Sequence, residues 1–213
     1  MKINLRLLDS EKSIASKILF ALIPEINKVL NKSINGIRSD IRTELISALK
    51  QEPEYGQLMA GSLRADLGIP DTNAVDNIVE QLANTTDVRI IPVSRLGQSI
   101  KGGIIIEAIQ SDNISNVIYS NEAYVTDSKG YSMPWLEWLL LRGNSVLVKG
   151  YDVEYGPSPY SRSGDGIMVK SSSDWRVPPE YQGKADNNWT TRAIDRLDNQ
   201  ISKIIKKNIE KNL

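Results

Sequence analysis

The chain contains neither cysteine nor histidine, and both absences restrict its chemistry. Without cysteine there is no disulfide, no thiolate nucleophile and no cysteine-ligated metal. Without histidine the commonest general base and the commonest metal ligand are missing as well. These absences exclude most hydrolase mechanisms, so we expect a protein that is not an enzyme, with no catalytic, cofactor-binding or metal-binding residue.

A long apolar run is also missing. No stretch approaches the roughly 20 apolar residues that a membrane span needs, so we expect no contact with a membrane. Residues 1–13, MKINLRLLDSEKS, carry charges inside a short apolar run and lack a small-residue cleavage signature. They do not resemble a signal peptide. We therefore expect synthesis in the cytoplasm.

An excess of charge of one sign is absent too, because 26 Lys and Arg balance 26 Asp and Glu over 213 residues. A neutral chain has no overall field that draws it to nucleic acid or to an anionic membrane, so such binding needs a local basic patch. The nearest approach to one is the set Lys203, Lys206, Lys207 and Lys211. Their place at the end of a predicted helix accounts for most of them, since lysines there complement the helix dipole.

Apolar residues spaced by three and four predict that residues 1–85 are mostly helical. The predicted helices cover residues 14–30, 34–49, a shorter segment at 54–68, and 71–85. Pro24 is expected to kink the first helix or to restart it one turn later. Gly68 is a plausible helix stop, and Asp71 or Thr72 is the expected N-cap of the last of these helices.

From residue 86 the pattern changes to β-branched runs bounded by Gly, Asp and Asn, which predict strands. The predicted strands cover residues 88–94, 102–110, 116–121, 145–155 and, more weakly, 166–170. Pro134 and Gly143 bound a short helix at 134–142. A final amphipathic helix begins near Asn187, with Asp186 or Asn187 as its cap.

This order of elements predicts a single α+β domain over residues 1–213. The mostly helical part, residues 1–85, precedes a β-rich part at 86–183, and the C-terminal helix occupies 187–213. We expect a central, mostly antiparallel sheet with the short helix inserted in it. The β-rich part also contains a long extended loop at 157–183.

The stretch GYDVEYGPSPYSRSGDG, residues 150–166, is crowded with Gly, Pro and Ser and contains Arg162. It could cradle a phosphate, position a catalytic group or dock on another subunit. Gly164 and Gly166 have no third glycine at dinucleotide-loop spacing, and the next residues are typical of a strand rather than a helix. A mobile hairpin tip is therefore preferred, although Arg162 could still contact an anion. Asp152 and Glu154 share one face of the preceding strand, where a solvated surface is the simplest interpretation.

Three short motifs occur in order along the chain. Gly61-Ser62-Leu63-Arg64 follows the N-terminal helices, Val153-Glu154-Tyr155-Gly156 ends a strand, and Pro178-Pro179-Glu180-Tyr181 precedes the last helix. In this order they resemble the neck and tail-completion, or tail terminator-like, proteins of tailed bacteriophages. Ala60 stands where that family often has Thr, and the helices at 71–85 and 134–142 look like additions. The subtype therefore stays open between a tail terminator and a neck or connector protein.

The resemblance implies a structural virion protein that forms a homo-oligomeric ring, commonly a hexamer, at the head–tail junction. Such a ring joins the tail tube to the head connector, contacts other neck, connector, tail-tube or sheath proteins, and lets genomic DNA pass through its lumen without sequence-specific binding. Rings close through heterologous contacts, which need protruding segments. We therefore expect the loop at 157–183 to be an assembly arm that becomes ordered on joining its neighbours. Aromatic and arginine side chains dominate interface energetics. The candidate contact residues are Tyr155, Arg162, Trp175, Arg176, Tyr181 and Trp189.

Two other classes of function remain as alternatives. A carboxylate- and metal-dependent, nuclease-like enzyme would need several acidic side chains, such as Asp152 and Glu154, to converge in one pocket. A nucleic-acid-binding module would show a binding constant that falls steeply with salt, and the neutral charge balance is the main objection to it.

Overall fold

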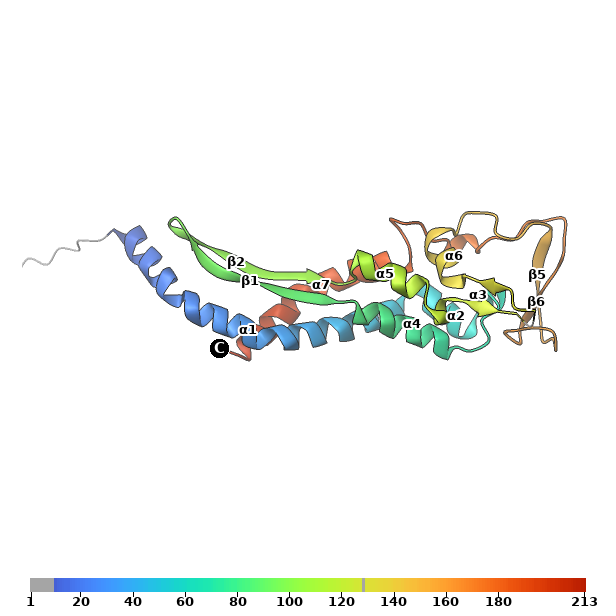
Figure 1. The fold of residues 1–213 in the computed structure, drawn as a ribbon, viewed down its shortest axis with the longest axis horizontal. Helices are drawn as coiled ribbons and strands as arrows, with labels where there is room; N and C mark the ends of the chain where they lie inside the picture. Colours follow the sequence, from blue (N-terminus) through green and yellow to red (C-terminus); the bar gives the residue numbers. More distant parts are fainter. Residues whose placement is uncertain (1–9, 128) are drawn as a thin grey trace, which may run out of the picture.

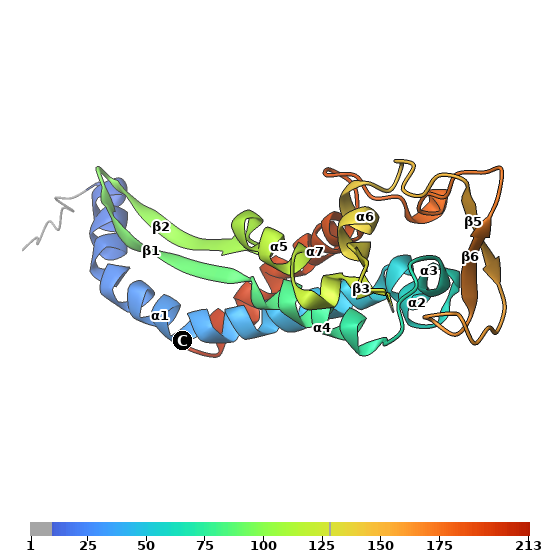
Figure 2. The same ribbon diagram turned by 45° about the vertical axis from the view of Figure 1, so that its right-hand side comes forward.

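The computed structural model describes residues 10–127 and 129–213, which form an elongated molecule (Figures 1 and 2). Of residues 1–13, which do not resemble a signal peptide, residues 1–9 lie outside the described residues. One half of the rod consists of the first part of a long helix and a β-hairpin alongside it (Figure 1). The other half gathers the short helices and the remaining strands. No described helix has the length and apolar content required to cross a bilayer.

The long helix α1, Glu11–Gln51, replaces the two helices predicted at 14–30 and 34–49. It continues through Pro24 and curves along its length, as Figure 2 shows. The helix does not restart because the apolar spacing after the proline stays in phase with the spacing before it. Gly36 does not interrupt α1 either, since its missing side chain leaves room for Asn208 of the last helix.

Three short helices follow α1. They are α2 (Pro53–Ala60), α3 (Ser62–Asp66) and α4 (Asn73–Asn84). The segment predicted at 54–68 is thus two helices, and Gly68 follows the second of them with a φ of 63°. Thr72 is the N-cap residue of α4, while Asp71 accepts a hydrogen bond from the backbone N–H of Asn73 at 2.9 Å.

The strands β1 (Asp87–Leu96) and β2 (Ser99–Glu107) form an antiparallel hairpin beside α1 and confirm strand formation at both predicted positions. The register slips between Ile91 and Ser94, which produces a bulge. Gly102 lies opposite this bulge with a φ of 149°, and a Cβ there would be 2.5 Å from the Cα of Val93. A side chain at Gly102 would therefore collide with the bulge.

The strand predicted at 116–121 is wrong, because residues Ser111–Ile118 form the helix α5. Val117 and Ile118 both pack into the core, and Ile114 packs against it. This three- and four-residue spacing matches a helix face that covers α4 rather than a strand with alternating sides. A 3-10 helix, η1 (Asn121–Ala123), follows directly.

The remaining elements are β3 (Val125–Thr126), β4 (Ser132–Met133), α6 (Trp135–Leu141), β5 (Tyr151–Tyr155), β6 (Gly166–Lys170) and the 3-10 helix η2 (Pro179–Tyr181). The helix predicted at 134–142 is confirmed as α6. The strand predicted at 145–155 is shorter than expected, and upstream of β5 only a bridge between Val148 and Trp175 forms.

The α+β class is confirmed. The strands are antiparallel, but in the described part of the chain they pair as three separate two-stranded sheets, β1–β2, β3–β4 and β5–β6. The expected central sheet does not assemble because each pair packs on its own support. The hairpin β1–β2 lies along α1, whereas β5 and β6 pack on α3.

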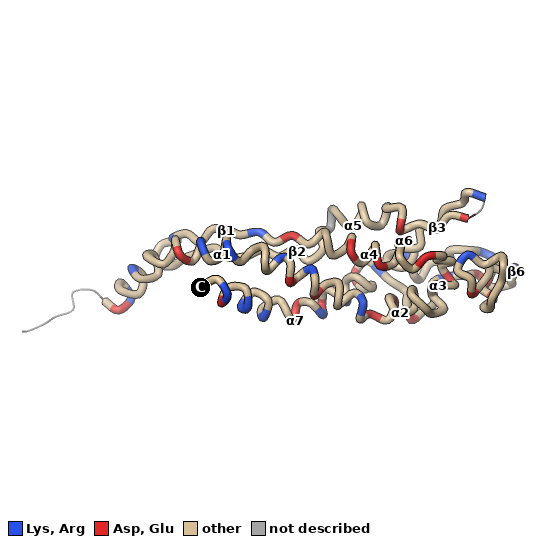
Figure 3. Tube along the Cα trace, turned by 90° about the horizontal axis from the view of Figure 1, so that it is seen from below, with Lys and Arg blue, Asp and Glu red and all other residues tan. Residues whose placement is uncertain are grey.

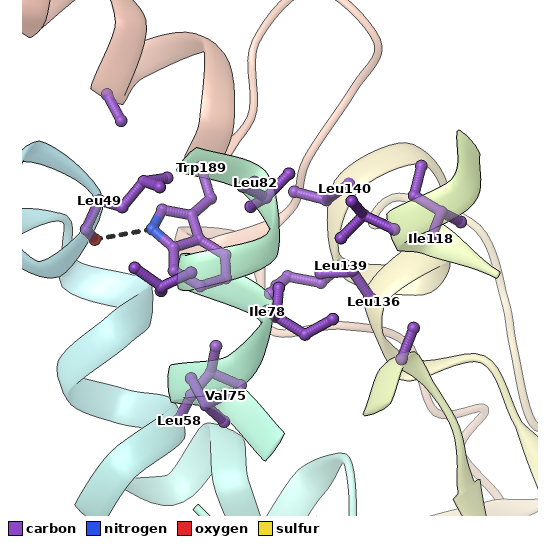
Figure 4. Packing of buried hydrophobic residues seen from close by; sticks show 14 of the residues in the cluster. Leu49, Leu58, Val75, Ile78, Leu82, Ile118, Leu136, Leu139, Leu140 and Trp189 are labelled. Atoms are coloured by element: carbon purple, nitrogen blue, oxygen red, sulfur yellow. Dashed lines mark hydrogen bonds between the residues drawn. The ribbon is translucent and has the colours of Figure 1, made fainter. Parts of the chain in front are cut away.

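The hydrophobic core lies between the second half of α1, α4, α6 and the last helix (Figure 4). That helix, α7 (Trp189–Glu210), begins at Asn188 rather than at the predicted cap residues. Asn188 forms a capping box with Thr191, which satisfies the free backbone N–H groups of the first turn. Trp189 is 1% exposed, and its indole N–H donates to the backbone oxygen of Leu49 at 2.9 Å, the dashed line in Figure 4.

Candidate assembly surface

The second half of the 157–183 loop is packed into the chain. Trp175 is 5% exposed, its backbone N–H donates to the oxygen of Val148 at 2.7 Å, and its ring lies 6.1 Å from that of Trp138. Val177 is fully buried nearby. The expectation of an arm that becomes ordered only on joining neighbours is therefore corrected here, because the core of the single chain already orders this segment.

The six candidate contact residues divide into two groups. Trp175 and Trp189 are in the core, where their rings pack within the chain and present no surface to a neighbour. Tyr155, Arg162 and Arg176 are exposed, and Tyr181 is half-buried. Sequence patterns could not separate the two groups, since an aromatic residue at the start of a helix or in a loop suits a core and an interface equally well.

Asp66 lies two residues after the first short motif and is hydrogen-bonded to the second. The hydroxyl of Tyr155 donates to its Oδ1 at 2.7 Å, which ties β5 to α3. Burial raises the pKa of Asp66, and the hydrogen bond from Tyr155 and the nearby indole of Trp175 only partly offset this effect. Burial and then Asp66 raise the pKa of Tyr155 in turn, and Glu180 adds to both shifts. The second motif thus forms this joint with Asp66, whereas the third contributes only the charge of Glu180.

The loop between β5 and β6 is held in a fixed shape by Arg64 and by a serine of its own. Arg64 donates to the backbone oxygen of Ser163 at 3.0 Å and ion-pairs with Asp165 at 3.7 Å. The hydroxyl of Ser161 donates to the oxygen of Gly166 at 2.6 Å and accepts from the N–H of Gly164 at 2.9 Å. Since β5 and β6 pair antiparallel on either side of this loop, it is a hairpin tip as predicted, but these hydrogen bonds hold it in one shape, contrary to the expected mobility.

Arg162 lies against Gly68 rather than over an anion-binding loop. A Cβ on Gly68 would be 3.0 Å from its guanidinium, and Nη2 is 3.6 Å from the sulfur of Met133. The open groove beside it, of about 740 Å³, is lined by charges of both signs, including Asp127 and Lys129. This mixture gives the groove no clear preference for a phosphate.

The acidic pair on β5 has ordinary local roles. Asp152 accepts hydrogen bonds from the backbone N–H of Val153 at 2.9 Å and from the hydroxyl of Ser173 at 3.0 Å, while Glu154 is exposed. Within residues 10–127 and 129–213, no three acidic side chains are placed to hold a metal ion together.

Apolar side chains remain uncovered on the half of the rod that projects beyond the core. Ile18 is 56% and Leu22 is 47% exposed on α1, and Leu96 is 58% exposed on β1. The buried residues of α1 begin only at Val29. The sequence predicted an amphipathic helix from residue 14, but it could not show that only the second half of the apolar stripe lies in the core.

An apolar groove lies where this part of α1 meets the end of α7. It has a volume of about 280 Å³ and its lining is formed by Leu22, Glu25, Ile26, Val29, Leu30, Ile209 and Leu213. Glu25 is paired with Lys28 at 3.1 Å, so apolar atoms dominate the groove. The two helices that form its walls are antiparallel and come from opposite ends of the chain (Figure 1).

The balanced net charge conceals a strong separation along the rod. Residues 11–42, 87–107 and 200–213 carry 13 Lys and Arg against 6 Asp and Glu. Residues 43–86 and 113–199 carry 11 Lys and Arg against 18 Asp and Glu. We call these the basic half and the acidic half. Figure 3 shows the basic residues of the first set along the end of α7 and the acidic residues of the second around α2.

Comparisons with known proteins return no match: no family model, no curated protein and no solved structure resembles this chain closely enough to count. The function is therefore inferred from the surface of the molecule itself.

Proposed function

We propose that this protein is a structural virion component of a tailed phage that assembles into a ring at the head–tail junction. The observation that carries the proposal is the projecting half of the rod, which leaves Ile18, Leu22 and Leu96 exposed on α1 and the β1–β2 hairpin. Exposed apolar patches on a rigid element favour a protein–protein contact, since water solvates them poorly. The order of the three motifs along the chain, which resembles that of phage neck and tail-completion proteins, supports the same class of protein.

The separation of charge suits this role. A heterologous contact joins two different surfaces, and a chain whose halves have opposite charge offers two such surfaces on each copy. Repeated contacts of this kind close into a ring when the rotation between copies allows it. The two faces of the closed ring, above and below the contacts between copies, then stay free for neck, connector or tail-tube proteins.

A nucleic-acid-binding module is a second candidate, because the basic half supplies the local patch that the net charge conceals. A duplex-binding constant that falls steeply with salt would support it. The nuclease-like alternative has no comparable support, since Asp152 and Glu154 do not converge with other acids in the described chain.

The proposal is tested in particles. Antibodies against the purified protein, or a small C-terminal tag, should locate the protein at the head–tail junction of mature virions by immunogold electron microscopy. Particles made without the protein should accumulate as unjoined heads and tails. Absence from purified virions would refute the virion role.

A further inference from the structure

We propose that copies of this chain associate head to tail, with the β5–β6 loop of one copy entering the apolar groove between α1 and α7 of the next. The inference rests on the proposed assembly function and names the two surfaces that meet. The loop contributes Tyr160 as the inserted side chain. The groove contributes Leu22 and Leu213 as its exposed walls.

Tyr160 has the features of an anchor residue. It is 88% exposed, while the loop around it is fixed by the serine hydrogen bonds and by Arg64. A side chain presented on an ordered loop loses little conformational entropy on binding, which favours affinity. Tyrosine is enriched in the buried centres of interfaces because it combines a large apolar ring with a polar tip.

The groove fits such an anchor in size and chemistry. Its volume of about 280 Å³ leaves room for an aromatic ring, and its lining is dominated by apolar side chains. No described segment of the same chain fills it. The segment that would fill it must leave the tyrosine hydroxyl at the rim, where Glu25 and water are available to it.

The charges around the two surfaces are complementary. Glu154 and Glu180 are exposed at the end of the rod that carries Tyr160. Lys32 and Lys211 are exposed too, and each is two residues away from a residue that lines the groove. Each surface belongs to a half with a net charge of the opposite sign. Opposite potentials speed the encounter and disfavour contacts between like halves. A second copy of this chain therefore suits the groove, because it brings an acidic surface to the basic residues beside the groove.

The test is self-association measured by sedimentation velocity in low salt, at protein concentrations up to about 0.5 mM. The wild type should form oligomers that dissociate as salt rises and screens the charges. Tyr160→Ser and Leu22→Ser should each raise the dissociation constant about tenfold or more. The matched controls Tyr119→Ser and Leu19→Ser, also exposed but outside the two surfaces, should leave it unchanged.

The decisive experiment is a reversal of the charges on the two surfaces. Glu154→Lys with Glu180→Lys makes the loop surface basic, and Lys32→Glu with Lys211→Glu makes the groove surface acidic. Each double variant alone should stay monomeric while keeping its circular dichroism spectrum. An equimolar mixture of the two should associate again, because each altered surface then meets its complement. A misfolded variant would not be rescued in this way.

Several outcomes would overturn the inference. These are a wild type that stays monomeric over the whole concentration range, Tyr160→Ser association equal to wild type, or a mixture that fails to recover. Binding of a labelled 20-base-pair duplex by a wild type that does not self-associate would assign the basic half to nucleic acid instead. Location in virions is measured separately, so a protein found at the junction but indifferent to these changes would refute only this contact. Rescue by mixing without virion incorporation would refute only the virion role.

Discussion

The side-chain amide of Asn27 in α1 forms two hydrogen bonds with the backbone of Val93 in β1. Its Nδ2 donates to the oxygen of Val93 at 2.9 Å, and its Oδ1 accepts from the N–H of Val93 at 2.7 Å. Val93 lies in the bulge, where the ladder with β2 is interrupted. One side chain therefore satisfies both backbone groups of Val93 and fixes the hairpin to the helix.

Replacing Asn27 by Leu should release the hairpin from α1. The backbone N–H and C=O of Val93 would lose their partners, at a cost of about 1–3 kcal/mol of unfolding free energy. Hydrogen exchange followed by mass spectrometry should show faster exchange in residues 87–107 and unchanged exchange in α4 and α7. Asn31→Leu is the control, since Asn31 bonds only within its own helix turn. Equal protection of the hairpin in both variants would contradict the proposed tie.

Gly102→Ala should distort the hairpin, because the added Cβ would lie 2.5 Å from the Cα of Val93 and 2.8 Å from the oxygen of Pro92. Overpacking of this kind costs about 1–3 kcal/mol. Gly103→Ala is the matched control, since Gly103 also has a positive φ but meets no atom within 4 Å. The difference in unfolding midpoint between the two variants measures the clash apart from backbone strain.

Tyr155→Phe should destabilise the protein by about 1–2 kcal/mol at neutral pH, because a buried carboxylate loses a hydrogen-bond donor. Tyr160→Phe should have no effect, since Tyr160 is 88% exposed. The loss in Tyr155→Phe should shrink in acid, where Asp66 is protonated. Urea denaturation at several pH values measures both effects, and a loss independent of pH would contradict the assignment.

Asp66→Asn should raise the free energy of unfolding above that of the wild type at neutral pH, and by less at acid pH. Burial raises the folded-state pKa of Asp66 above its unfolded value, so the folded chain favours the protonated form. The unfavourable effect of the charge is absent below the unfolded pKa, appears as pH rises toward the folded pKa, and is complete above it. The stability gained by Asp66→Asn should therefore fade as pH falls through this window. Urea unfolding of both proteins across the window measures it, and a gain that is constant with pH would contradict the cause.

Arg192→Met should destabilise the junction between α1, α2 and α7 by about 2–3 kcal/mol, because it leaves the buried carboxylate of Glu54 without a cation, whereas Glu52 keeps its ion pair with Arg196. Arg192 pairs with Glu54 and lies 3.3 Å from Glu52, and both carboxylates are almost fully buried. Arg176→Met is the control, since Arg176 is exposed. Thermal unfolding compares the two, and equal melting temperatures would show that the buried pair contributes nothing.

Much of the local structure could be predicted from residue spacing. The helix at 71–85 follows from apolar periodicity and an Asp or Thr cap, and the helix at 134–142 follows from Pro134 and Gly143 at its ends, all of which depend only on neighbouring residues. The strand predicted at 116–121 failed because Val117, Ile118 and Tyr119 are compatible with either element. Packing on α4 selected the helix, and that contact is not encoded in the short run itself.

The candidate surface was less accessible to prediction. Trp175 and Trp189 are of a residue type that is common at interfaces, yet both are buried in the core. In contrast, no sequence pattern distinguishes Tyr160 from the other residues of its Gly- and Pro-rich loop. The neutral net charge argued against charged partners, but it is a sum over two halves of opposite sign. Only the path of the chain shows that residues 11–42, 87–107 and 200–213 lie together.

The sequence by itself determined the α+β class, most of the helices and the absence of cysteine and histidine chemistry, because these depend on composition and on contacts a few residues apart. The tertiary structure decided which part of α1 is buried, how the strands divide into separate pairs and where charge accumulates. These properties depend on contacts between residues far apart in the chain, such as Asn27 with Val93 and Trp189 with Leu49, and no local pattern specifies them.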